Sequence, residues 1–101
     1  MGKELTMSVV IVGGNECMVR QYEKLCKQYN CKPKVYPKMC SGLRNIGSPD
    51  LLVIFTGITS HKMVQCALKQ TRNSKTQIAR TQSASMSSLR KVLVENVEVR
   101  A

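Results

Sequence analysis

Hydrophobic residues form two kinds of pattern along this chain. Some form continuous runs, which are typical of buried strands, and others recur every three or four positions, which is typical of helices. Ser8 to Val12 (SVVIV) and Leu51 to Phe55 (LLVIF) are continuous runs rich in β-branched residues. Such runs predict strands that are buried on both faces of a sheet, and the more hydrophobic LLVIF is expected at its centre. Lys34–Tyr36 and Gln77–Arg80 predict two shorter strands. Prolines on both sides of Lys34–Tyr36 favour an edge position for it, because proline cannot donate to a ladder.

Between these segments the apolar residues recur every three or four positions, which predicts three amphipathic helices. Asn30 is a stop signal for the first helix, Thr59 or Ser60 an N-cap for the second, and Ser83 or Ser85 an N-cap for the third. The apolar stripes are Met18, Tyr22, Leu25, Cys26 and Tyr29 in the first helix, Val64, Ala67, Leu68 and Thr71 in the second, and Met86, Leu89, Leu93 and Val97 in the third.

Strands that alternate with helices imply a parallel sheet whose connections cross over its faces. The predicted fold is α/β: a small three-layer sandwich with a four-stranded parallel sheet in the order 2-1-3-4 and helices on both faces. We expect one domain over residues 1–101, with a core from about residue 8 to 95. Residues 1–7 are interpreted as a short leader, and residues 38–48 as a loop with one weak helical turn at Leu43–Ile46.

Composition excludes several classes of protein. Hydrophobic residues make up 43% of the chain and charged residues 22%, which is ordinary for a folded protein and argues against disorder. The longest uncharged apolar run, Leu51–Ile58, is far shorter than the roughly 20 residues that span a bilayer. No segment has the pattern of a secretory signal. We therefore expect a cytoplasmic protein that does not contact a membrane.

Charge points to an anionic partner. Sixteen Lys and Arg against six Asp and Glu give a net charge of +10, and such a field attracts phosphorylated ligands and nucleic acid. The basic residues are spread along the chain without a block of five, which excludes a basic tail. Aromatic residues are only 4% of the chain. Sequence-specific recognition of a single strand by base stacking is therefore not expected.

The cysteines favour a reducing compartment. Five of them, at positions 17, 26, 31, 40 and 66, form no CxxC pair, and an odd number does not suit a disulfide framework. Cys26 and Cys66 fall in helical patterns and are interpreted as small core residues. Cys17, Cys31 and Cys40 lie near the ends of loops and are the more reactive candidates. A thiolate pair of Cys17 or Cys40 with His61 is one alternative to consider.

The candidate site lies in the loops that follow the strands. Ligands of open parallel sheets bind outside the carboxyl ends of the strands, where helix N-termini offer N–H groups to an anion. Gly13-Gly14 follows the first strand but lacks the G-x-G-x-x-G fingerprint of dinucleotide-binding folds. One histidine and no paired carboxylates complete neither a catalytic nor a metal site, so a binding protein is expected rather than an enzyme, and the sequence does not identify a cofactor. The candidate ligand-binding residues are Gly13, Gly14, Lys38, Thr56, Ser60, His61, Lys62, Arg80, Ser83 and Ser85.

Four motifs in this order resemble a bacterial family of small domains of unknown function. They are the strand that ends in Gly13-Gly14, the Pro49-Asp50 step before the LLVIF strand, the Ser60-His61 pair, and Arg80-x-x-Ser83-x-Ser85. The resemblance covers residues 8–95. It implies a cytoplasmic Rossmann-like or flavodoxin-like half-domain in which these glycines, Ser60, His61, Arg80 and Ser83 matter, and it implies no activity. Asn15 departs from the pattern, since many relatives have His or Arg there.

These observations favour a regulatory or ligand-binding module that holds a phosphate-containing or nucleotide-like anion at the ends of the strands. Lys62 and Arg80 would neutralise the charge of the ligand, and His61 would make binding depend on pH. Three alternatives remain: a nucleic-acid-binding protein that uses its basic surface, a cysteine-dependent redox sensor or enzyme, and an assembly subunit. A homodimer is the expected oligomer, because two-fold symmetry is the commonest arrangement.

Overall fold

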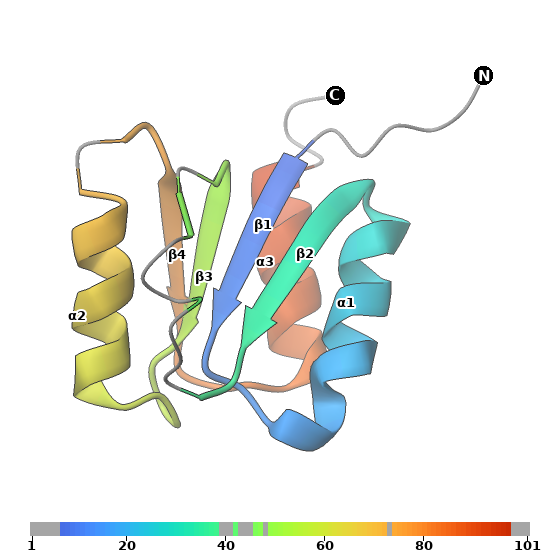
Figure 1. The fold of residues 1–101 in the computed structure, drawn as a ribbon. Helices are drawn as coiled ribbons and strands as arrows, with labels where there is room; N and C mark the ends of the chain where they lie inside the picture. Colours follow the sequence, from blue (N-terminus) through green and yellow to red (C-terminus); the bar gives the residue numbers. More distant parts are fainter. Residues whose placement is uncertain (1–6, 39–41, 43–45, 48, 73, 98–101) are drawn as a thin grey trace.

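A four-stranded parallel sheet forms the middle layer of the structure, a computed structural model that describes residues 7–38, 42, 46–47, 49–72 and 74–97. The strand order is β2-β1-β3-β4, as predicted. Figure 1 shows the four strands side by side with their carboxyl ends at one edge. The strands are β1 (Met7–Val12), β2 (Cys31–Tyr36), β3 (Leu51–Phe55) and β4 (Gln77–Thr81). The helices are α1 (Val19–Gln28), α2 (His61–Gln70) and α3 (Met86–Val97), with a 3-10 turn, η1 (Glu16–Met18), before α1.

Helices cover both faces of the sheet, which confirms the predicted layers. Along β1, Val9 and Ile11 belong to the cluster that holds residues of α1 and α3, whereas Val10 and Val12 belong to the cluster of α2. This alternation follows from the period of two along a strand. The hydrophobic runs of β1 and β3 are therefore explained, because each of these strands has a strand on either side and helices above and below.

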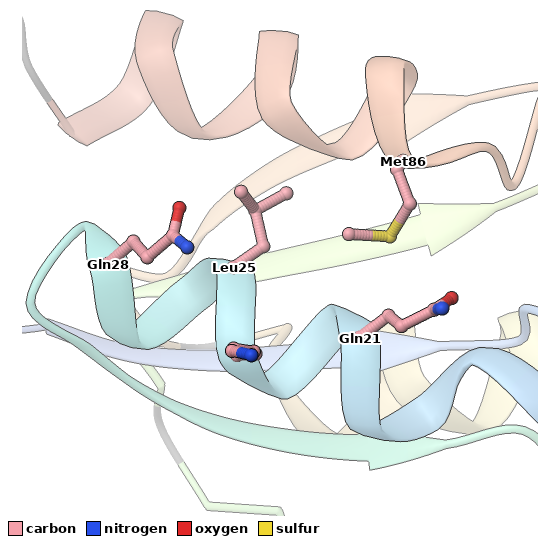
Figure 2. A pocket seen from close by; sticks show the side chains of 5 residues that line it. Gln21, Leu25, Gln28 and Met86 are labelled. Carbon is pink, nitrogen blue, oxygen red and sulfur yellow. The ribbon is translucent and has the colours of Figure 1, made fainter.

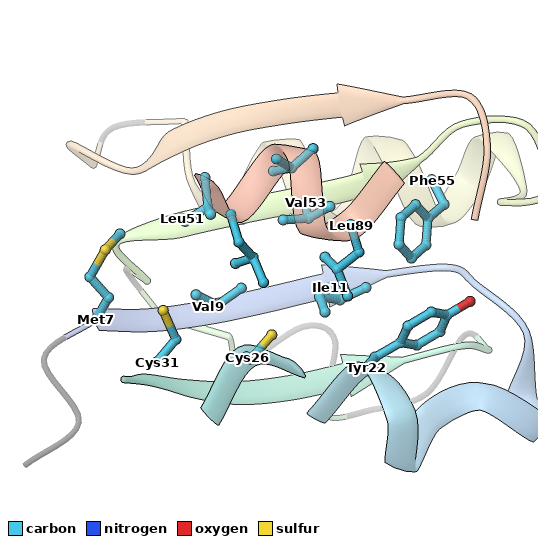
Figure 3. Packing of buried hydrophobic residues seen from close by; sticks show 12 residues of the cluster. Met7, Val9, Ile11, Tyr22, Cys26, Cys31, Leu51, Val53, Phe55 and Leu89 are labelled. Carbon is cyan, nitrogen blue, oxygen red and sulfur yellow. The ribbon is translucent and has the colours of Figure 1, made fainter. Parts of the chain in front are cut away.

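The larger core lies under α1 and α3, and two aromatic rings, those of Tyr22 and Phe55, lie at its end near the carboxyl ends of the strands (Figure 3). Tyr22 is fully buried, and its ring lies 5.4 Å from that of Phe55. The Tyr22 hydroxyl donates to the Ala84 carbonyl at 2.7 Å and accepts from the Asn15 amide at 3.2 Å. One side chain therefore ties α1 to β3 and to the loops that precede η1 and α3, and it does so without leaving its buried hydroxyl unsatisfied.

The smaller core lies under α2, the one helix on its face among the described elements. Met63 and Ala67 of α2 are buried there, together with Ile46 from the segment before β3. The buried stripe of α2 runs through Met63, Ala67 and Thr71, whereas Val64 and Leu68 are only partly buried. The sequence predicted Ala67 and Thr71 of this stripe correctly. It also included Val64 and Leu68, which are closer to solvent, and it omitted Met63, which is buried.

Local signals placed the helix ends well. Ser60 caps α2, and its Oγ accepts from the Met63 amide at 3.3 Å. Ser85 precedes α3 and accepts from the Ser88 amide at 3.2 Å. Asn30 follows α1 with a φ of 59°, a left-handed conformation that asparagine tolerates at a helix end.

The second strand is longer than predicted. β2 begins at Cys31 rather than at Lys34, and Pro33 lies inside it, opposite Val9 of β1. An edge strand tolerates proline because half of its N–H groups face away from its single neighbour. The prolines therefore indicated the edge position correctly but not the boundary of the strand. Residues 1–6, Cys40 and most of the expected helical turn at Leu43–Ile46 lie outside the described residues.

Candidate functional site

The loops that follow the strands meet at one edge of the sheet, as predicted (Figure 1). Backbone hydrogen bonds join neighbouring loops beyond the strands themselves. The Gly13 amide donates to Tyr36 at 2.9 Å, and the amides of Thr56 and Gly57 donate to Thr81 and Gln82 at 2.8 and 3.1 Å. The ends of β1 and β2, and those of β3 and β4, are therefore held together in pairs.

The two glycines after β1 are required by packing. Gly13 and Gly14 have φ values of 92° and 95°, which L side chains rarely adopt. A Cβ on Gly13 would collide with the side chain of Thr59, and one on Gly14 would lie 2.9 Å from the Tyr22 ring. The Thr59 hydroxyl donates to the carbonyl oxygens of Val12 and Phe55. Thr59 thus fills the space between the ends of β1 and β3, where strand order reverses and a ligand is usually found.

The first turn of α2 presents the most open candidate groups. Ser60, His61 and Lys62 are all exposed there. The Nε2 atom of His61 lies 3.1 Å from the amide nitrogen of Gln65, one turn further along the helix. The free N–H groups of this turn and the positive end of the helix dipole favour an anion.

Arg80 lies at the end of the fourth strand. The sequence predicted it as the last strand residue, where the loop begins, and it lies within β4, one residue before the end. It pairs with Ile54, whose side chain belongs to the α2 cluster. Because paired residues of neighbouring strands point to the same face, Arg80 lies on the α2 side of the sheet, the side from which His61 and Lys62 also extend.

Lys38 forms an ion pair that the sequence did not predict. Its Nζ lies 2.9 Å from a carboxylate oxygen of Glu16, and both side chains are exposed. The hydrogen bond and the negative charge of Glu16 raise the pKa of Lys38. The charge of Lys38 is therefore compensated within the chain, which leaves it less to offer a ligand than Lys62.

The serines before α3 serve largely as caps. Ser83 Oγ accepts from the Ser85 amide at 3.2 Å, and Ser85 Oγ lies 3.1 Å from Ser88 Oγ. The helix that they precede covers the face opposite to α2. The predicted residues thus divide into Ser60, His61, Lys62 and Arg80 on the α2 side and Ser83 and Ser85 toward the α3 side. Thr56 is exposed at the end of β3, where its hydroxyl contacts the Thr81 carbonyl at 3.4 Å.

The cysteines divide by burial. Cys31 was predicted to be among the reactive thiols, and this was wrong, because it begins β2 and is fully buried. Burial is the main cause that raises the pKa of Cys26 to about 12, and it also raises the pKa of Cys31. Both thiols therefore stay protonated and unreactive at neutral pH. Cys17 is exposed, and Cys66 is partly buried. No group of three possible metal ligands occurs among the described residues.

Two surface grooves lie away from the predicted residues. The larger, of about 410 Å³, is on the outer side of α2 and is lined by Gln65, Leu68, Lys69 and Arg72. The smaller, of about 150 Å³, lies between α1 and the start of α3, and Figure 2 shows Leu25 of α1 and Met86 of α3 on either side of it. Its lining residues are Gln21, Lys24, Leu25, Gln28 and Met86.

Sequence reasoning missed Lys69 and Arg72, although a signal for them exists. The chain contains no Asp or Glu between Asp50 and Glu95, so the basic residues of α2 and β4 have no acidic neighbour in sequence. Counting net charge for the chain as a whole concealed this asymmetry. The rule that ligands bind at the carboxyl ends of strands also points away from the outer side of α2.

Comparison with known proteins places the chain in a family. A family model described as an uncharacterized protein conserved in bacteria, DUF2325, matches residues 8–96. The chain belongs to this family. The matched residues include every candidate ligand-binding residue, and the assignment confirms the predicted membership of a bacterial family of unknown function. No curated protein and no solved structure gave a significant match. In the part of the DUF2325 domain that the structure describes, no helix is both long and apolar enough to cross a membrane.

Proposed function

We propose that this DUF2325 domain is a binding module for a phosphate-containing ligand, with its site at the start of α2. The observation that carries the proposal is the set of uncompensated groups on this side of the sheet. Ser60, His61 and Lys62 are exposed on the first turn of α2, and the exposed Arg80 faces the same side from β4. None of them forms an ion pair with a carboxylate of the described residues, in contrast to Lys38.

The local chemistry suits a phosphate. The amides of the first helical turn can donate to an anion, Lys62 supplies positive charge on the same turn, and Arg80 supplies it from the same side of the sheet. Arginine in particular binds phosphate through two parallel N–H groups. The imidazole of His61 adds a further hydrogen-bond donor. A nucleotide or another phosphorylated metabolite has the required chemistry.

The other predicted residues support this site indirectly. Gly13 and Gly14 let Thr59 and Tyr22 pack between the strand ends, which fixes the loop that leads into α2. Ser83 and Ser85 cap the segment before α3. We also infer a relation to flavodoxin-like folds, supported by the order β2-β1-β3-β4, which equals the first four strands of their order. A cytoplasmic location and a homodimer stay predictions of the sequence.

A binding role is favoured over a catalytic one by the surroundings of His61. Its Nε2 contacts the side chain of Gln65, and no described carboxylate is hydrogen-bonded to the ring to orient it. A general base usually has such a partner. The buried thiols of Cys26 and Cys31, with raised pKa values, do not suit nucleophilic catalysis either.

A thermal-shift titration tests the proposal. The protein is melted with inorganic phosphate, with nucleotides and with sugar phosphates, and the series is repeated for His61→Ala, Lys62→Ala and Arg80→Ala. A ligand at a hundredfold excess over its Kd stabilises the folded state by about 2.7 kcal/mol. The control is Lys32→Ala, because Lys32 is exposed on β2 at the opposite edge of the sheet.

We expect at least one phosphate compound to raise the melting temperature, with the shift lost in the three site variants and kept in Lys32→Ala. If no phosphate compound shifts a cooperative transition, the proposed site is wrong. A shift that all four variants weaken equally would also contradict it, because it would report the net charge of the protein rather than a site.

A further inference from the structure

The second half of the chain carries positive charge without any negative charge. Between Leu51 and Val94 it has seven basic residues and neither Asp nor Glu. Five of the seven lie on α2, on the turn after it and on β4, and all five are exposed. We call these five residues the basic side: Lys62, Lys69, Arg72, Lys75 and Arg80.

Helical geometry puts two of these residues on one stripe of α2, and a third follows in the turn after the helix. Lys69 lies seven residues after Lys62, a spacing of about two turns, and Arg72 lies two residues past the end of α2. The buried stripe of Met63 and Ala67 holds the opposite side of the helix against the sheet. The exposed cations are therefore spread along α2 and the turn after it, over about 15 Å, the length of a ten-residue helix.

The charge of the basic side is available to a partner. Its residues form no ion pair with the carboxylates of the described residues, where Lys38 and Glu16 make the one pair. The groove of about 410 Å³ on α2 lies between Lys69 and Arg72 and includes the apolar Leu68. Ile78, 40% exposed, lies on this side as well, because it pairs with Leu52 of the α2 cluster. A surface on which cations surround uncharged groups matches a nucleic-acid backbone, because charged phosphates alternate there with uncharged sugars.

We propose that the basic side binds the phosphodiester backbone of double-stranded nucleic acid. A single phosphate cannot contact cations that are spread over about 15 Å, whereas a polymer of phosphates can. Residues 56–101 contain no Phe, Tyr or Trp, so the imidazole of His61 is the one ring that this part of the sequence offers to an unpaired base. The basic side therefore suits contacts to the backbone of a duplex, which position the protein without reading sequence. This surface extends beyond the proposed phosphate site, with which it shares Lys62 and Arg80.

The number of phosphate contacts predicts how strongly the binding constant depends on salt concentration. If the five cations each neutralise one phosphate, log K falls against log salt concentration with a slope of about −4.5. Removal of two contacts should reduce the slope to about −2.7 and weaken binding at 0.1 M salt by about fifty-fold.

Fluorescence anisotropy with a labelled DNA duplex, and with an RNA duplex of the same sequence, tests the proposal. The variant is Lys69→Gln/Arg72→Gln. The matched control, Arg20→Gln/Lys24→Gln, removes one arginine and one lysine from the exposed surface of α1 and so changes the net charge equally. We expect at least one duplex to bind with the steep salt dependence, the α2 variant to lose most of the affinity, and the α1 control to keep it. The two probes show which nucleic acid is preferred.

Three results would overturn the proposal. One is the absence of binding to both duplexes at low salt, and another is an equal loss in the α2 variant and the α1 control. The third is binding to vesicles of anionic lipid, lost in the α2 variant, with no binding to a duplex. Lys69→Gln/Arg72→Gln leaves His61, Lys62 and Arg80 intact, so a thermal shift with phosphate should persist in it. The failure of this proposal is therefore distinguishable from the failure of the phosphate site.

Discussion

The two faces of the sheet differ in packing and in charge. The face under α1 and α3 holds the larger core, in which Tyr22 and Phe55 are fully buried. Its helices mix charges, with Glu23 on α1 and Glu95 on α3 among the basic residues. The face under α2 has a smaller core and one helix, and that helix carries no acidic residue. The α1 and α3 face therefore holds more of the buried side chains, and the α2 face carries the proposed anion-binding surface.

The concentration of positive charge on the α2 side is expected to lower the stability of the folded state. Like charges that lie close together on α2 and β4 repel one another. A partner with negative charge removes this repulsion when it binds. An uncompensated surface is therefore expected on a face that binds an anion, whereas the hydrogen bonds of Tyr22 tie together the elements of the opposite face.

The largest expected effect comes from truncation in the larger core. Tyr22→Ala removes the ring that packs on Phe55 and the hydroxyl that bonds to Ala84 and Asn15. We expect it to lower the free energy of unfolding by about 3–5 kcal/mol. Met63→Ala, in the smaller core, should cost about 2 kcal/mol, near the lower end of the usual range. Urea denaturation measures both. Equal losses would show that the two faces contribute equally and would break the comparison.

A smaller effect is a pH dependence that belongs to the α1 face. Burial raises the pKa of Cys26 from its ordinary value of 9.0 to about 12. The thiol is protonated in both states below pH 9, so its contribution to stability is complete there. Between pH 9 and about 12 only the unfolded state loses the proton, so stability should fall, by about 1.4 kcal/mol per pH unit for one thiol.

The measurement is urea denaturation across that range, with Cys26→Ala as the control. The variant lacks the thiol, so its stability should fall less steeply above pH 9 than that of the wild type. The other ionisable groups are the same in both proteins, so the difference between the two curves reports the Cys26 thiol. Parallel curves would mean that Cys26 is accessible to solvent, against its place in the larger core.

The smallest expected effect concerns the α2 side. Ile78→Ser removes an apolar side chain that is 40% exposed. We expect the free energy of unfolding to change by no more than about 0.5 kcal/mol, as for most surface substitutions. A loss that depends on protein concentration would instead show that a second copy covers β4. The predicted homodimer would then use this face, and the basic side would be partly hidden.

The sequence predicted the fold more completely than the site, and particular residues show why. The LLVIF run, the Ser60 cap and the Asn30 stop depend on local periodicity and backbone preference, which a sequence displays directly. The pairing of Lys38 with Glu16 and the position of Thr59 against Gly13 depend on segments that are far apart in the chain. No spacing rule reports such contacts.

The placement of Arg80 shows the same limit in another way. The Arg80-x-x-Ser83-x-Ser85 motif identified Arg80 as a candidate residue. The face of the sheet to which Arg80 points depends on the register of β4 against β3. A shift of one residue would turn it to the α3 side. The register also decides that Arg80 joins Lys62 rather than Ser83 and Ser85. The sequence alone therefore could not show which candidate residues lie on the α2 side of the sheet and which lie toward the α3 side.

The central claim is that the α2 side receives the anion and the α1 side does not. The most direct test is a titration of the isotope-labelled protein with a nucleic-acid duplex, followed by the amide chemical shifts of each residue. We predict that the largest shifts fall between His61 and Thr81 and that residues 19–28, on α1, change little. Shifts that are largest on α1, or equal on the two faces, would contradict the account.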